Sequence, residues 1–255
     1  MSVIAIFAHP GHELRAFGWC MRHRPTVFFL TTGQGSEDKG RLATSLGILN
    51  EIGCRVSARS GSFSDREIYA AMLAGRPEEV AEVFNSVLEE HGDRVDRLIF
   101  DRIEGFNPAH DLVGVLGREM AHRISSGRSG AKPSAWEISL ESLPGEDEEH
   151  PDSGELCRCT DEELQRKLSV ARSYAELAPE VLRAIREVGV EAFRTEWGHR
   201  VDPGRSVEES VPNEPAFERY GEERVRQNIY SHVLRRDDHL LPFLRHLLQQ
   251  LKWGR

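Results

Sequence analysis

The sequence predicts an α/β fold in which helices cover both faces of a parallel β-sheet, followed by a mainly helical C-terminal part. Two observations predict it. Unbroken apolar runs alternate with helical patterns over residues 1–125, and such runs are typical of strands buried on both faces. At ~150 residues per domain, the 255 residues correspond to one domain, with an α/β core in 1–125 and variable loops and helices in 126–255.

Each expected element follows from its apolar pattern and from the Gly, Pro or capping residues at its ends. The expected strands of the first half are 3–8, 26–32, 54–58 and 95–100, and the expected helices are 13–23, 41–52, 77–91 and 112–124. The later elements are expected to be loops at 125–133, 144–155 and 202–215, an edge strand at 136–140, and helices over 160–188 and 222–253. Thr160-Asp-Glu-Glu163 has the form of a capping box.

The composition argues against several functional classes. Lys and Arg total 33 against 42 Asp and Glu, so the net charge is −9, whereas proteins that bind nucleic acids or anionic membranes need a basic surface. No window approaches the ~20 apolar residues of a membrane span, and the apolar N-terminal run lacks the basic flank of a signal peptide. The four cysteines form no CxxC pair and are expected to be reduced. We therefore expect a cytoplasmic protein with a small-molecule partner. The oligomeric state stays open.

Two histidine-containing loops follow buried strands of the predicted sheet. His9-Pro-Gly-His12-Glu13 comes directly after the first strand, and His110 follows the strand that ends near Asp101. Ligands of parallel α/β sheets bind beyond the carboxyl ends of the strands. His9 and His12 are close enough across the turn to chelate one ion, and His110 would leave a fourth position open, as in catalytic zinc sites. The alternative is that these are ordinary polar loop residues.

Several motifs of this chain resemble those of the PIG-L/LmbE family of de-N-acetylases. The strand followed by AHPGHE is similar to the family's opening AHPDDE motif, and NPAHDLVGVLGREMA resembles its HPDH motif with the following helix. Further similar segments are TTGQG, SFSDREIYAAML, AFRTEWGHRV and PAFERYGEERVRQNIYSHVLRRDDHLLPFLRHL. The resemblance implies a Rossmann-like fold that holds one zinc ion and hydrolyses an acetamide on an amino sugar or a related glycoconjugate.

The resemblance also implies that His9, His12 and His110 hold the zinc ion, with imidazole at the second position, where the family has a carboxylate. Three neutral imidazoles leave the ion a charge of +2, which favours acidification of bound water. The family's general base falls at Gly11, which cannot transfer a proton. An aspartate at position 11 is therefore expected to raise any amidase rate, by up to ~10²–10⁴-fold, without disturbing His9 and His12.

Two other family positions have also lost their proton-transfer groups. The auxiliary His of the family falls at Asn107, and the Asp beside the metal-binding His falls at Ala109. Asn107 could still donate a hydrogen bond to an oxyanion. Glu13 and Asp111 are the remaining candidates for a catalytic carboxylate, and the alternative role for both is to orient a ligand imidazole.

Substrate contacts are expected from three further residues near the same edge of the sheet. Arg41 opens a predicted helix where the family often has an Arg that faces the substrate, and Asp65 and Arg66 belong to the similar segment SFSDRE. The alternatives are a solvated arginine at position 41 and a helix-capping aspartate at position 65. Packing or surface roles, and no ligand roles, are expected for His199, His232 and His239.

The sequence thus leads to a zinc-dependent hydrolase that acts on an N-acyl amino sugar or a related conjugate. Two alternatives stay open because the family's Asp and His are absent. One is a homologue without catalysis that binds a sugar-like ligand or a partner. The other is an enzyme that uses zinc for a different reaction.

Overall fold

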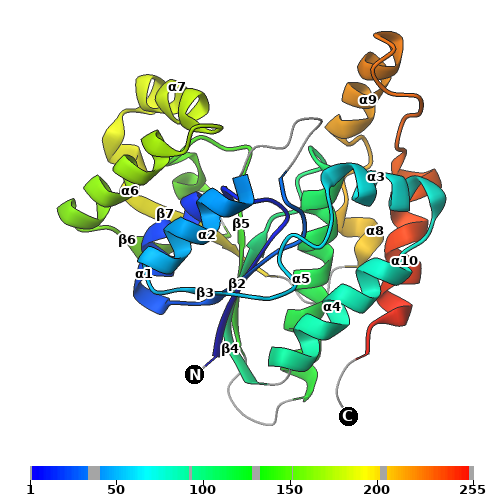
Figure 1. Cartoon of the computed structure of the whole chain (residues 1–255), viewed down its shortest axis with the longest axis horizontal. Coiled ribbons are helices and arrows are strands. Elements are labelled where there is room, and N and C mark those ends of the chain that lie inside the picture. Colours follow the sequence, from blue (N-terminus) through cyan, green and yellow to red (C-terminus); the bar gives the residue numbers. More distant parts are fainter. Residues whose placement is uncertain are drawn as a thin grey trace.

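The computed structural model describes residues 2–33, 41–91, 94–127, 133–150, 152–201 and 206–252. Its centre is a seven-stranded sheet in the order β3-β2-β1-β4-β5-β7-β6 (Figure 1). The strands are β1 (Ser2–Phe7), β2 (Thr26–Phe29), β3 (Arg55–Val56), β4 (Val95–Asp101), β5 (Ser134–Ile138), β6 (Ser153–Arg158) and β7 (Thr195–Arg200). β1 to β5 are parallel, whereas β7 runs antiparallel to both β5 and β6. The α/β fold class is confirmed.

Helices cover both faces of this sheet (Figure 1). The α-helices are α1 (Phe17–His23), α2 (Arg41–Glu51), α3 (Asp65–Ala74), α4 (Glu78–His91), α5 (Pro108–Gly127), α6 (Asp161–Ser173), α7 (Ala178–Val188), α8 (Val207–Ser210), α9 (Ala216–Arg226) and α10 (Leu241–Gln250). The short turns are η1 (His12–Ala16), η3 (Glu146–Glu149), η4 (Val190–Phe193) and the π-helical η5 (Arg236–Leu240). Within the described ranges, every helix is too short or too polar to cross a bilayer.

Side chains of β1 point alternately into the two halves of the core. Ile4 and Ile6 pack with α3, α4, α5 and α10, whereas Ala5 and Phe7 pack with α1, α2 and α6. A strand buried on both faces needs apolar residues at every position. This explains the unbroken apolar run at the N-terminus and positions its carboxyl end in the middle of one sheet edge.

The second half of the chain contributes more strand than the sequence indicates. Among the described residues beyond 125, helices predominate as expected, but β5, β6 and β7 also lie there and complete the sheet. β5 lies between β4 and β7 and is not an edge strand, and β6 begins within the segment expected to be a loop. The reason is that β7 buries Glu196 and His199, so its inward positions do not read as apolar in the sequence.

The expectation of one continuous helix over 222–253 is also wrong. α9 ends at Arg226, and Asn228 then adopts a left-handed backbone conformation with φ of 58°, which a helix cannot continue through. The chain returns to helical structure only at η5 and α10.

The capping box of Thr160 and Glu163 at the start of α6 is confirmed. Parts of the expected loops 125–133 and 202–215, and most of TTGQG beyond its first glycine, lie outside the described residues.

Candidate metal centre

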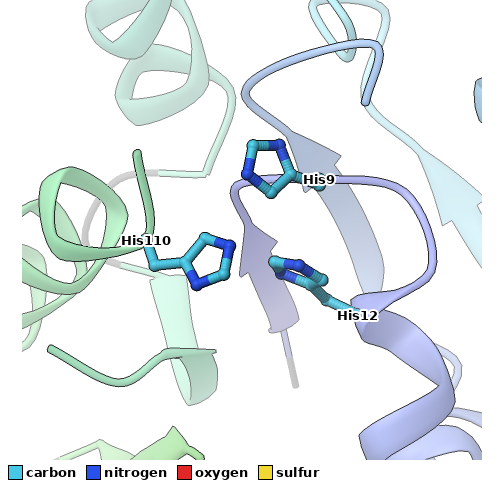
Figure 2. A group of neighbouring side chains, drawn as sticks. All are labelled: His9, His12 and His110. Atoms are coloured by element: carbon cyan, nitrogen blue, oxygen red, sulfur yellow. The ribbon is translucent and has the colours of Figure 1, made fainter. Parts of the chain in front are cut away.

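Three histidines converge at the carboxyl edge of the sheet. Figure 2 shows the rings of His9, from the loop after β1, His12, at the start of η1, and His110, in the first turn of α5, facing one another. One nitrogen from each ring lies within 4.8 Å of the others. Zinc–nitrogen bonds of ~2.0–2.1 Å place the ligand nitrogens of a tetrahedral site roughly 3.3 Å apart. Small side-chain rotations therefore close this cluster around one ion.

Acidic or hydroxyl groups contact the Nδ1 atoms of His9 and His12. Nδ1 of His12 lies 2.9 Å from Oδ2 of Asp101, the last residue of β4. Nδ1 of His9 lies 2.8 Å from Oγ1 of Thr31 and 3.0 Å from Oδ1 of Asp65. A carboxylate that accepts the Nδ1 proton leaves Nε2 free as a donor to a metal, an arrangement common to zinc-binding histidines. These contacts fit a metal centre better than a simple packing cluster.

Burial favours the neutral, metal-binding form of His12 and His110. The exposed fractions of His9, His12 and His110 are 6%, 9% and 7%. Burial, together with the charge of the neighbouring histidines and Arg41, lowers the pKa of His12 and of His110 well below the ordinary value. Nδ1 of His110 is buried and has no hydrogen-bond partner among the described residues. An unpaired buried donor or acceptor costs free energy, and a bound cation would remove that cost if this nitrogen ligated it. The cluster can therefore bind a metal ion.

Glu13 fastens the loop that carries His9 and His12. Its carboxylate accepts a hydrogen bond of 2.6 Å from the backbone amide of Gly11 and another from the hydroxyl of Ser45 on α2. Burial raises the pKa of Glu13, although these hydrogen bonds oppose the rise. The hydroxyl of Tyr174 lies 3.1 Å from that of Ser45 and donates to the carbonyl of Arg41. The side chain of Glu13 is thus already engaged with its own loop.

Asp111 plays the same part in the loop before α5. Its Oδ1 accepts hydrogen bonds of 3.0 Å from the backbone amides of Glu104 and Gly105. Burial raises the pKa of Asp111 to about 7, against the effect of those two bonds. Its Oδ2 is buried without a hydrogen-bond partner among the described residues. Like Glu13, Asp111 holds a loop that presents a histidine to the centre.

Gly11, where the resemblance places a general base, has a backbone and surroundings that disfavour a side chain. Its φ is +102°, a conformation that L-residues rarely adopt. A Cβ on this residue would lie 2.4 Å from Cδ1 of Leu177 and 3.2 Å from Nη2 of Arg41. The expectation that an aspartate at position 11 leaves the loop undisturbed is therefore wrong. Leu177, in the turn before α7, and the Arg41 guanidinium occupy the space that its side chain would need.

The residues expected to contact substrate differ in their distance from the centre. The Arg41 side chain lies against Gly11, and its Nε is buried without a hydrogen-bond partner among the described residues. Asp65 contacts His9 and does not cap α3, because the capping box there belongs to Ser64 and Glu67. Hydrogen bonding to His9 lowers the pKa of Asp65 although burial opposes it. Arg66, by contrast, is exposed.

Asn107 is placed beside the cluster. Its Nδ2 lies 3.3 Å from Nε2 of His9, and its Oδ1 accepts hydrogen bonds from the backbone of Ala109 and the hydroxyl of Tyr69. The amide group therefore lies against Nε2 of His9, the ring nitrogen that the contacts of Nδ1 leave for a metal.

The three C-terminal histidines lie outside the cluster. His199 is buried on β7 beside Arg102, Ser139 and Asp147. His232 is exposed, and Nδ1 of His239 accepts from the Arg235 backbone. The packing and surface roles expected of them agree with these positions.

Sequence reasoning missed two residues of the centre. Asp101 supports His12, and its signal was a buried acidic residue at the carboxyl end of an apolar strand. Leu177 closes the space at Gly11 from a turn 166 positions along the chain, and no local pattern could have indicated that contact. Comparisons of the chain with protein-family models, with curated proteins and with solved structures gave no match.

Proposed function

We propose that this chain is a zinc-dependent hydrolase that cleaves an N-acyl group from an amino sugar or a related conjugate. One observation carries the proposal: three buried histidine rings converge at the carboxyl edge of the sheet, and acidic side chains contact two of them. The resemblance of AHPGHE and NPAH to the PIG-L/LmbE motifs supports the choice of reaction. Three-histidine sites with an open fourth position are typical of catalytic zinc.

The metal ion, when bound, supplies Lewis acidity toward the carbonyl of the scissile amide. His9, His12 and His110 would hold it. Burial raises the pKa of Asp101 to about 8, and its carboxyl group 2.9 Å from Nδ1 of His12 would orient that ring for binding through Nε2 when it accepts the Nδ1 proton. The side chain of Asn107, beside Nε2 of His9, would donate a hydrogen bond where negative charge develops as the substrate amide is attacked.

Arg41 adds a positive charge beside the centre. Its guanidinium group lies against the Gly11 loop and lowers the pKa of His12 and His110 through its charge, an effect secondary to burial. No ion pair of this guanidinium with another described residue is present. A cation next to three neutral ligands favours the binding of a polar or anionic substrate group. We assign Arg41 this substrate-binding role. Arg66, exposed on α3, is a second and more peripheral candidate.

A second candidate function is favoured by the crowding at Gly11. Leu177 and Arg41 fill the space in which the family's base would stand, while Glu13 and Asp111 are engaged with backbone amides. A chain with this arrangement could retain the metal centre to bind a sugar-like ligand or partner, or to carry out a different zinc reaction.

The test begins with zinc content and then measures acetate release. The purified protein is expected to bind one zinc per chain, and His110→Ala is expected to lose it. His122→Ala is the matched control, because His122 is an exposed histidine on the same helix. Wild type that retains no zinc, or binding that His110→Ala leaves unchanged, would contradict the metal centre.

Acetate release from N-acetylglucosamine and its glycosides then separates the two functions. The hydrolase predicts release that requires zinc and that His110→Ala abolishes. A zinc-loaded chain that binds these compounds without releasing acetate supports the second candidate.

A further inference from the structure

Four aromatic side chains, which we call the aromatic rim, lie on segments that adjoin the candidate metal centre: Tyr69, Phe106, Tyr220 and Tyr230. Three of them are unusually exposed for large hydrophobic residues, with exposed fractions of 52% for Phe106, 51% for Tyr220 and 41% for Tyr230. The rings of Tyr220 and Tyr230 contact each other edge to face, with centroids 6.4 Å apart. Exposed apolar groups that gather in one place commonly mark a binding site.

Tyr69 and Phe106 connect the rim to the histidines. The hydroxyl of Tyr69 donates a hydrogen bond of 3.4 Å to Oδ1 of Asn107, whose Nδ2 lies 3.3 Å from Nε2 of His9. Phe106 directly precedes Asn107 in the loop after β4. Burial raises the pKa of Tyr69, and the nearby Tyr230 and Asp65 raise it further. Tyr69 therefore lies beside Asn107 and within electrostatic range of Tyr230.

The segment that carries Tyr220 and Tyr230 is fastened at both ends. The backbone amide of Phe217, in the first turn of α9, donates to the carbonyl of Gly105. Arg235 closes the segment with hydrogen bonds of 3.0 and 2.7 Å to Glu218 and Glu222. Figure 1 shows α9 standing beyond α3 at the carboxyl edge of the sheet. The start of α9 is thus tied to the loop of Phe106, and Arg235 ties the end of the segment back to α9.

The chemistry of the rim indicates what it binds. The guanidinium of Arg224 lies 4.7 Å from the centre of the Tyr220 ring, a cation–π contact that restricts the ring. Restricted, exposed aromatic rings bind partners with a flat apolar face at a low cost in conformational entropy. A pyranose ring with its C–H face and an aryl ring both have this property.

We propose that the aromatic rim binds a ring with an apolar face, carried by the substrate beyond the group that meets the metal centre. The inference rests on the proposed function for the reacting end of that substrate. It adds a requirement for a second ring, and this ring is a sugar or an aryl group. The substrate class is then a conjugate of at least two rings.

The experiment measures ligand binding to the zinc-loaded full chain by calorimetry, without turnover as a readout. The probes are N-acetylglucosamine with one ring, N,N′-diacetylchitobiose with two sugar rings, and phenyl N-acetyl-β-glucosaminide with a sugar and an aryl ring. At least one two-ring probe is expected to bind about two- to tenfold tighter than the one-ring probe, because one aromatic contact contributes roughly that factor. The probe that gains affinity identifies the source of the ring.

Variants of the rim test the assignment. Tyr220→Ala with Tyr230→Ala is expected to abolish the preference for two rings, whereas the corresponding Tyr→Phe pair retains it. Val190→Ala, at another partly exposed apolar position, is the control and is expected to leave it unchanged. Light scattering on the same variants reports whether the rim is instead an interface between copies of the chain.

Three outcomes would overturn the proposal. The first is no gain in affinity from a second ring. The second is an equal loss of affinity for one-ring and two-ring probes in the double alanine variant, and the third is a change of oligomeric state in that variant with the preference for two rings intact. These outcomes are separable from failure of the proposed function. A chain that prefers two rings but releases no acetate contradicts the hydrolase alone, and a chain that releases acetate without a ring preference contradicts the rim alone.

Discussion

Replacing Gly11 with alanine should destabilise the protein strongly, because two independent costs meet at this residue. The backbone has φ of +102°, and holding an L-residue in a left-handed conformation costs roughly 1–2 kcal/mol. The new Cβ would also lie 2.4 Å from Cδ1 of Leu177, the end of a partly buried side chain, and turning that side chain out of its rotamer costs about 0.5–1.5 kcal/mol. We therefore expect the free energy of unfolding to fall by about 1.5–3.5 kcal/mol.

Urea denaturation measures this change as a lower midpoint with an unchanged slope. Leu177→Ala in the same chain should recover the steric part of the loss and leave the backbone part, so the two substitutions should couple in a double-mutant cycle. Gly47→Ala is the matched control. It lies in the interior of α2, and nothing stands within 4 Å of its new Cβ, so it should stabilise the protein by up to about 1 kcal/mol.

Gly11→Ala with the midpoint of the wild type would refute this account of the loop. The same reasoning applies to Gly11→Asp, which meets both costs with a longer side chain. It should lower stability and fail to raise acetate release, because Leu177 and Arg41 occupy the space beside the centre.

Three further predictions concern the supports of the fold and of the site. The hydrogen bond from Arg22 lowers the pKa of Glu163 from 4.5 to about 2, so this pair stabilises the protein above pH ~4.5 and the contribution is lost as the pH falls toward 2. Because Arg22 is 41% exposed, the free energy of unfolding of the wild type should be only about 1 kcal/mol higher than that of Glu163→Gln at neutral pH. A difference in unfolding free energy that persists below pH 2 would contradict this assignment. Glu196→Gln should cost about 3–5 kcal/mol in denaturation experiments, since it leaves the buried Lys167 without its partner at 2.8 Å. Asp101→Asn should weaken zinc binding roughly 10–100-fold in a chelator competition assay, and an unchanged affinity would argue against its support of the histidine.

The clustering of His9, His12 and His110 could be predicted from the sequence because it depends on local features. His9 and His12 follow β1 directly, and His110 lies in the first turn after the β4 loop. Once both strands are recognised as parallel neighbours, the sheet brings their carboxyl ends together whatever the rest of the chain does. The pairing of β1 with β4 is sufficient to bring the three rings within reach.

The strands of the second half could not be predicted in the same way, because their buried positions are polar. Glu196 on β7 accepts hydrogen bonds from the amides of Gly18 and Trp19 and pairs with Lys167. These partners lie about 30 and about 180 positions away along the chain, so the residue reads as a surface acid until the fold is known. A buried polar position satisfied by distant groups leaves no periodic apolar signal.

Contacts between residues far apart in the sequence also change the charge expected at the candidate metal centre. Counting ligands along the sequence gives three neutral imidazoles and therefore a site charge of +2 for a bound zinc ion. The structure places the carboxyl group of Asp101 2.9 Å from Nδ1 of His12. An acidic group therefore stands one imidazole away from the centre, and a carboxylate paired with a ligand raises the basicity of that ligand. The ion would consequently acidify bound water less than three isolated imidazoles imply. Proton transfer therefore remains the step for which this chain offers the least, and acetate release is the measurement that decides between its two candidate functions.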